Sequence, residues 1–203
     1  LLAASGSNGT PLPPDATTIS GSNLVGYWRN DGDTTWTDRS GNGNTGTVNG
    51  TPDSIYLTEG MYGNRDSQGF HISDTSGWMG FDGSAAYVSC GDMSEIEDVT
   101  NISIEMWING NVVNTYDSFF GKTSALEMHV YTGSQIWFWN SNATAKWTTA
   151  ISPNTWYHVV GTYDGANMRI YVNSEEGTSA GSTISTVSNS NPVTIGTYST
   201  NYF

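Results

Sequence analysis

Residues 156–173, WYHVVGTYDGANMRIYVN, decide the fold of this chain. On both sides of the central loop at 164–167, side chains of different character alternate with period two, which is the repeat of a β-strand. The loop, DGAN, is rich in residues that tolerate left-handed backbone angles. The stretch therefore predicts a hairpin of two strands, with Met168, Ile170 and Val172 buried, in a layered all-β protein.

Three segments resemble one family and occur in the same order along the chain. They are the hairpin at 156–173, the pair LVGYW and DRSGNGN at 24–28 and 38–44, and the pair FDG and ISIEMW at 81–83 and 102–107. These motifs resemble the laminin G-like, concanavalin A-like jelly-roll domains, and together they span most of residues 24–203. The resemblance implies a two-sheet antiparallel jelly-roll sandwich. It says less about the ligand, because one fold carries many functions.

The composition agrees with a single β-sandwich. The chain has 203 residues, with 24 Gly, 8 Trp and 11 Tyr, which is enough for one full core and typical of a turn-rich sheet protein. We expect almost no helix. Residues 1–22 are rich in Ser, Gly, Thr and Pro and predict an extended linker with few core contacts. Residues 23–203 then form the jelly-roll domain, with an inserted loop or hairpin at about 52–76, where the family pattern is interrupted.

Acidic residues dominate the charge of the chain. Nineteen Asp and Glu against six Lys and Arg give a formal net charge of −13, and such a field repels nucleic acids and anionic membranes. We expect no nucleic-acid partner and no membrane insertion.

The single cysteine, Cys90, excludes an intrachain disulfide bond. The family's final strand has no counterpart after residue 196, so we expect this sequence to be an excerpt whose terminal strand is removed or supplied by another segment.

The loop at 38–44 is the candidate metal site. Asp38, Asn42 and Asn44 offer carboxylate and amide oxygens on turns that glycine permits, and Ca²⁺ prefers such ligands. Some relatives bind Ca²⁺ near this loop with help from an acid on the final strand, and the counterpart of that strand is not found in this sequence. The alternative is an Asx-rich turn that its own backbone hydrogen bonds satisfy.

Aromatic side chains are the candidate ligand contacts. Trp137 and Trp139 share one face of an expected strand, where they would either stack on sugar rings or pack into the core. Trp36, Tyr62 and Trp147 lie in expected rim loops, which vary without disturbing the core, and we expect these three to bind the ligand.

The two carboxylates that most glycoside hydrolases require are not evident. The nearest match is Glu95 and Glu97, in an acidic turn that lacks a second downstream Glu. Glu105 stands alone on its strand. His158 occupies a position that the family uses structurally, so we expect a satisfied core histidine rather than a base. We therefore expect no enzymatic activity.

The resemblance implies non-catalytic recognition of a glycan or cell-surface polysaccharide. The segments at 24–32 and 35–44 look particularly like modules of phage structural proteins, which suggests a carbohydrate-binding or adhesion module of a larger extracellular or virion-surface protein. The alternative is a structural decoration domain that contacts neighbouring virion subunits, and a glycoside hydrolase is a third interpretation. A glycan binder should display aromatic rings beside polar groups, whereas an assembly domain should bury them against a neighbour.

Overall fold

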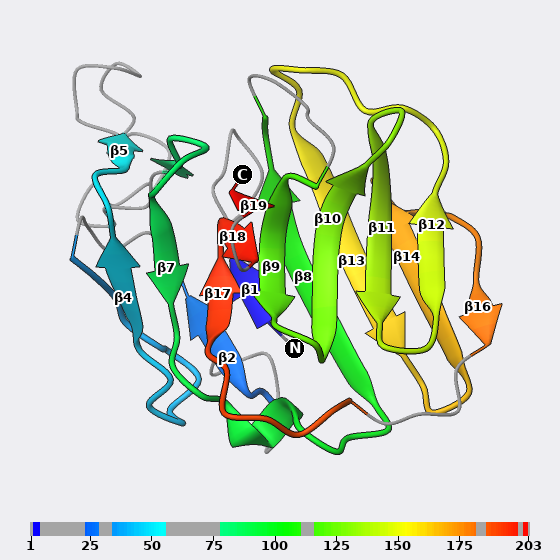
Figure 1. Ribbon diagram of the computed structural model, residues 1–203, viewed down its shortest axis with the longest axis horizontal. Helices are drawn as coiled ribbons and strands as arrows, with labels where there is room; N and C mark the ends of the chain where they lie inside the picture. The colour runs from blue at the N-terminus through cyan, green and yellow to red at the C-terminus, as the bar shows by residue number, and fades with distance from the viewer. Residues whose placement is uncertain are drawn as a thin grey trace, which may run out of the picture.

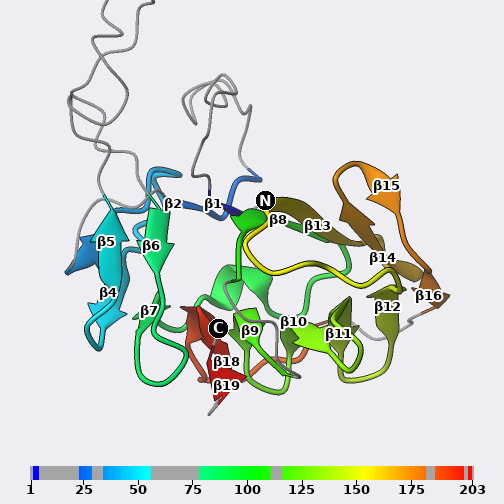
Figure 2. The same ribbon diagram turned by 90° about the horizontal axis from the view of Figure 1, so that it is seen from above.

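The computed structural model describes residues 2–4, 23–28, 34–55, 78–110, 116–181, 186–198 and 201–202. In these residues the regular structure is almost entirely β, and the one helical segment is a single 3-10 turn at Ser94–Ile96. No helix in the described ranges has the length and hydrophobicity needed to cross a membrane. Two large sheets lie one behind the other in Figure 1, and Figure 2 shows them as separate layers.

The first layer is a seven-stranded sheet of order β15-β14-β13-β8-β1-β2, with β16 paired to β14. Its strands are β1 (Leu2–Ala4), β2 (Gly26–Trp28), β8 (Ile102–Ile108), β13 (Tyr157–Tyr163), β14 (Asn167–Val172), β15 (Glu175–Glu176) and β16 (Ala180–Gly181). β13 and β14 pair antiparallel, and Met168, Ile170 and Val172 are buried. The hairpin predicted from residues 156–173 is confirmed, because period two and a permissive loop are local signals.

The second layer is an eight-stranded antiparallel sheet of order β12-β11-β10-β9-β17-β7-β4-β3. Its strands are β3 (Thr35–Trp36), β4 (Gly46–Asn49), β7 (Tyr87–Ser89), β9 (Ser118–Lys122), β10 (Leu126–Tyr131), β11 (Gln135–Asn140), β12 (Thr144–Trp147) and β17 (Val193–Ile195). The outer face of this sheet is turned toward the viewer in Figure 1. Two further pairs are β5 (Asp53–Ile55) with β6 (Trp78–Gly80), and β18 (Thr197–Tyr198) with β19 (Asn201–Tyr202).

The hydrophobic core lies between the two sheets. Inward residues alternate with outward residues along each strand, as in other sandwiches. The inner side chains include Ile104, Met106, Val159, Met168, Phe120, Met128, Ile136 and Phe138. At Gly161 of β13, an added Cβ atom would lie 2.9 Å from Cγ of Phe138 in β11, so the layers meet here with no spare room. This is the expected antiparallel jelly-roll sandwich.

Two segments outside the core were expected as a linker and an insertion. Leu2–Ala4, within the expected linker 1–22, instead forms β1, which pairs in parallel with both β2 and β8. Three extended residues can pair with both strands through backbone groups alone, so the composition of the segment does not reveal the pairing. At about 52–76, the flanks pair as β5 and β6. Residues 5–22 and 56–77 lie outside the described residues.

Candidate functional site

An aromatic and polar cluster covers the outer face of β10 to β12. In β10, Leu126, Met128 and Val130 face the core, so the residues between them point outward. Cross-strand register then sets the outward side chains of β11 and β12 beside them. We call this cluster the β10–β12 patch; it consists of Tyr116, Glu127, His129, Tyr131, Gln135, Trp137 and Lys146.

Ring contacts connect the members of the β10–β12 patch. Tyr131 and Trp137 stack with ring centroids 3.7 Å apart and an interplanar angle of 25°. Tyr116 meets Tyr131 edge-on at 5.0 Å, and their hydroxyl oxygens are 3.2 Å apart. Nζ of Lys146 lies 4.2 Å from the Trp137 ring centroid, within range of a cation–π contact. The result is an aromatic surface with polar groups along its border.

The His129 side chain lies beneath these rings, and its imidazole makes no hydrogen bond within the described residues. The residue is 5% exposed, and its ring is 5.9 to 6.0 Å from those of Tyr116, Tyr131 and Trp137. Nδ1 is 3.2 Å from Oε1 of Glu127, an ion-pair distance if the ring is protonated, but the two atoms lack the alignment of a hydrogen bond. Nε2 is also unpaired. Buried polar atoms are nearly always paired, so His129 marks the patch as a candidate site.

The two expected rim contacts that the structure describes, Trp36 and Trp147, lie outside the β10–β12 patch. Trp36 in β3 is 5% exposed and belongs to the core, because its strand turns this side chain inward; it is not placed to contact a ligand. Trp147, at the end of β12, is half-buried and packs against the core rather than standing exposed. Tyr62 lies outside the described residues. Trp137 and Trp139 share one face as expected; that face is the outer one rather than the core, and both side chains are half-buried.

The carboxylate of Asp38 is saturated by donors from its own surroundings. Oδ1 accepts from the backbone N–H groups of Tyr27 at 3.0 Å and Ser40 at 2.8 Å. Oδ2 accepts from Ser40 Oγ at 2.8 Å and from the backbone N–H of Asn44 at 2.9 Å. Burial alone would raise the pKa of Asp38, but these hydrogen bonds outweigh it and hold the pKa below its ordinary value.

The amide groups of the same loop also bond within the protein. Asn42 and Asn44 donate through Nδ2 to the carbonyl oxygens of Leu24 and Val25. A Ca²⁺ ion takes six to eight oxygen ligands, whereas N–H donors occupy the oxygens of Asp38 here. In the described part of the chain, no three His, Cys, Asp or Glu side chains gather where a metal could bind. The arrangement does not fit Ca²⁺ and matches the Asx-rich turn, which leaves calcium binding as a prediction to test.

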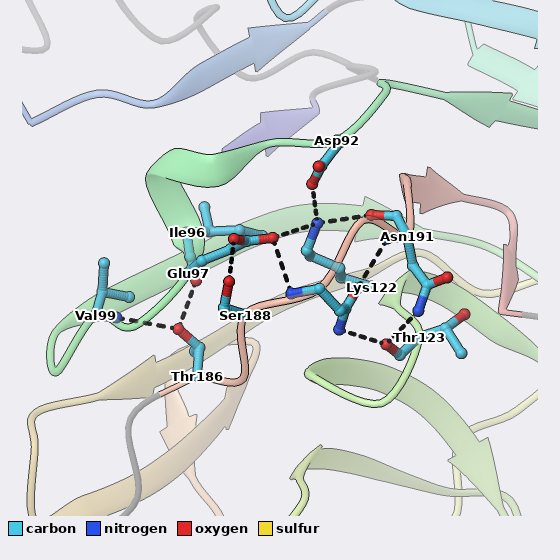
Figure 3. Close-up of polar contacts among 10 residues, drawn as sticks. Asp92, Ile96, Glu97, Val99, Lys122, Thr123, Thr186, Ser188 and Asn191 are labelled. Atoms are coloured by element: carbon cyan, nitrogen blue, oxygen red, sulfur yellow. Dashed lines mark hydrogen bonds and ion pairs between the residues drawn. The ribbon is translucent and has the colours of Figure 1, made fainter.

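A second polar cluster, the Lys122 cluster, surrounds the end of β9 (Figure 3). Lys122 is 0% exposed, and its Nζ lies 2.6 Å from Oδ1 of Asp92, 3.0 Å from Oε1 of Glu97 and 2.6 Å from the carbonyl oxygen of Asn191. Three acceptors match the three N–H donors of an ammonium group. Hydrogen bonds from Lys122 and Ser188 lower the pKa of Glu97 to about 2. A general acid needs the opposite shift, so Glu97 serves structure here.

The remaining acid and base candidates lie on different surfaces. Glu95 is exposed in the 3-10 turn. His158 was expected in the core but lies half-exposed on the outer face of β13, because period two sets it opposite buried Val159. Its Nε2 is 2.8 Å from Oε1 of Glu105 on the neighbouring strand β8. The hydrogen bond from His158 is the main reason that the pKa of Glu105 is lowered.

Comparisons with known proteins agree with this fold. A family model described as the concanavalin A-like lectin/glucanases superfamily matches residues 82–203, which is more than half of the chain. Among solved structures, domain 4 of AbnA, a GH43 extracellular arabinanase from Geobacillus stearothermophilus, in complex with arabinotriose, aligns with a TM-score of 0.57. The alignment covers 88% of this chain and 86% of that domain at 15% identity, which shows a shared fold. No curated protein matches the sequence. By its family match and its sandwich, this chain belongs to the concanavalin A-like lectin/glucanases superfamily.

Proposed function

We propose that the chain is a non-catalytic carbohydrate-binding module that binds a glycan on the β10–β12 patch. The observation that carries this proposal is the stacked pair of Tyr131 and Trp137, with Lys146 and Gln135 at its border. Aromatic surface suits the C–H groups of a sugar, and the bordering polar groups can orient its hydroxyls. The superfamily's lectins, and a fold neighbour solved with arabinotriose, support the choice of ligand class.

The absence of catalysis in this proposal follows from the charges of the patch. Glycoside hydrolases generally use two carboxylates on either side of the scissile bond. The β10–β12 patch, as defined from the described residues, contains one carboxylate, Glu127, which lies beside His129. Glu97, the other acid considered, is bound to Lys122. Binding without hydrolysis is the chemistry that these groups can perform.

The setting of the module is part of the same proposal. The resemblance of residues 24–44 to modules of phage structural proteins supports an extracellular or virion-surface protein, in which this domain adheres to a cell-surface polysaccharide.

A second candidate function is assembly of virion subunits. It is favoured by Trp107, which is 37% exposed on the outer face of β8, away from the patch. Sedimentation of the purified chain and of Trp107→Ala would show whether this tryptophan joins subunits.

The test of glycan binding is a panel of neutral and charged oligosaccharides, with arabinotriose as one probe, followed by calorimetric titration of the best ligand. We expect Trp137→Ala to weaken that ligand at least about tenfold, because removing a buried aromatic contact commonly costs more than 1 kcal/mol. Trp107→Ala, on the opposite sheet, is the matched control and should bind normally. If Trp107→Ala lost affinity for the ligand and Trp137→Ala did not, the binding site would lie on the outer face of the other sheet. Release of shortened sugars would refute the non-catalytic assignment.

A further inference from the structure

Tyr116 has a backbone conformation that its residue type rarely adopts. Its φ angle is +71°, in the left-handed region where Cβ crowds the backbone and where glycine or asparagine is usual. Strained residues of this kind gather at ligand sites and switch regions. Tyr116 immediately precedes β9 along the chain and contacts the β10–β12 patch with its ring.

The backbone and the side chain of Tyr116 are held very differently. Its backbone N–H donates to the carbonyl oxygen of Val130 at 2.7 Å, which anchors the main chain to β10. Tyr116 is 45% exposed, and among the described residues its side chain makes one hydrogen bond, with the hydroxyl of Tyr131 at 3.2 Å. The ring can therefore rotate away while the main chain stays paired.

The ring of Tyr116 lies next to His129, the one imidazole among the described residues that lacks hydrogen bonds. Its centroid is 6.0 Å from that of His129, whose two ring nitrogens are both buried and unpaired among the described residues. Because Oε1 of Glu127 is 3.2 Å from Nδ1, a small rotation would direct Nδ1–H to that carboxylate. The tautomer with a proton on Nδ1 leaves Nε2 as an acceptor.

We propose that Tyr116 caps His129 in the free protein, and that a bound glycan displaces the cap and donates a hydroxyl hydrogen bond to Nε2 of His129. This inference rests on the proposed function and assigns the residue that reads a sugar hydroxyl. The stacked rings of Tyr131 and Trp137 provide general affinity, and His129 provides orientation. The unpaired nitrogens of the free state are then satisfied only in the complex.

The first test separates stability from binding. His129→Leu removes the unpaired nitrogens while keeping an apolar side chain, so its melting temperature should equal or exceed that of the wild type. Its affinity for the best oligosaccharide of the panel should fall about tenfold or more, as when a site loses its partner for a hydroxyl. His158→Leu, which breaks the pair with Glu105, is the matched control and should lower the melting temperature without changing affinity. Normal affinity in His129→Leu would overturn the inference.

The second test examines the cap. Tyr116→Phe keeps the ring but loses the hydroxyl contact with Tyr131 that holds the cap in place, so affinity should be higher than that of the wild type. Modification by diethyl pyrocarbonate, mapped by mass spectrometry, should be slow at His129 in the wild type and fast in Tyr116→Ala. Slow modification in Tyr116→Ala would disprove capping, and unchanged or weaker binding by Tyr116→Phe would contradict displacement. If no glycan binds the wild type, the proposed function fails, while the modification rates still decide whether Tyr116 caps His129.

Discussion

At the scale of single residues, two buried basic side chains behave in opposite ways. Lys122 is 0% exposed and has an acceptor for each ammonium hydrogen. His129 is 5% exposed, and its imidazole has no hydrogen bond among the described residues. A buried charge with all its hydrogen bonds made fixes the positions of the segments that contribute its partners. A buried polar group without hydrogen bonds is free to form them with a ligand. Substitution should therefore affect stability at Lys122 and affinity at His129.

Replacing Lys122 with methionine should destabilise the fold strongly. The variant leaves Glu97 and the carbonyl oxygen of Asn191 without their buried partner, and removing one member of a buried ion pair typically costs about 3 kcal/mol or more. Urea denaturation would measure the loss of unfolding free energy. Lys146→Met, which loses only a cation–π contact with Trp137, is the control and should cost less than about 1 kcal/mol. Equal losses in the two variants would contradict this role for Lys122.

The Lys122 cluster should also make stability depend on acid pH. The pKa of Glu97 falls from 4.5 to about 2, mainly through hydrogen bonds from Lys122 and Ser188. Because the folded value is below the unfolded value, the contribution of Glu97 is complete above about pH 4.5 and is lost as the pH falls toward 2. Melting temperatures across this window should fall less steeply for Glu97→Gln than for the wild type. Glu95→Gln, which changes an exposed acid of the same turn, should show the same dependence of melting temperature on pH as the wild type. If all three proteins showed the same dependence, Glu97 would not be its cause.

At the scale of elements, packing between the two sheets determines which residue β13 can carry at position 161. Gly161 faces Phe138 of the opposite sheet, and a Cβ atom there would meet the ring at 2.9 Å. Gly161→Ala should therefore destabilise the fold by about 1–3 kcal/mol, the usual range for overpacking. Gly181→Ala in the edge strand β16 is the matched control, because its nearest neighbouring atom is 4.0 Å away. Denaturant midpoints that fall equally would show that glycine at 161 is not a packing requirement.

The loop between β3 and β4 tests the calcium interpretation. Asp38 already accepts four hydrogen bonds, so we expect the wild type to melt at the same temperature in EDTA and in millimolar Ca²⁺. Asp38→Asn should melt lower in both solutions, because its amide NH₂ replaces one acceptor oxygen. A rise with Ca²⁺ in the wild type that Asp38→Asn lacks would mean preferential binding of the ion to the native state. That result would restore Asp38, Asn42 and Asn44 as a metal site.

At the scale of the whole molecule, net charge and the patch act over different distances. A formal charge of −13 creates a long-range field that repels anions, while ring contacts act only at the surface. Affinity for a neutral oligosaccharide should therefore change little with ionic strength. Binding of an anionic polysaccharide should be weakest at low salt and improve as screening increases. Calorimetric titrations at two salt concentrations would check both, and tighter binding of the anionic polymer at low salt would oppose this expectation.

Much of the architecture was predictable because its signals are local. The hairpin predicted at 156–173 is β13 with β14, and the strand expected to carry Trp137 and Trp139 is β11. Period two and turn-forming residues report backbone geometry within a few positions, without reference to the rest of the fold. The shared face of Trp137 and Trp139 follows in the same way.

The candidate site was less predictable, because it depends on residues brought together by the fold. No sequence motif distinguishes His129 from the other two histidines of the chain. Its ring is enclosed by Tyr116, on another segment, and by Trp137, on the neighbouring strand, and its nitrogens find no hydrogen-bond partner among the described residues. The burial of Trp36 depends likewise on the core that covers it. A sequence pattern tells which side chains share a face, but not what lies against that face.

The sequence by itself determined the antiparallel jelly-roll sandwich, its family and most of its strands, because alternation and turn chemistry act between near neighbours in the chain. The tertiary structure alone decided which faces point outward, that β1 pairs between β2 and β8, and that the His129 imidazole is buried without a hydrogen-bond partner among the described residues. These properties depend on the register between strands and the packing between layers, where distant segments meet.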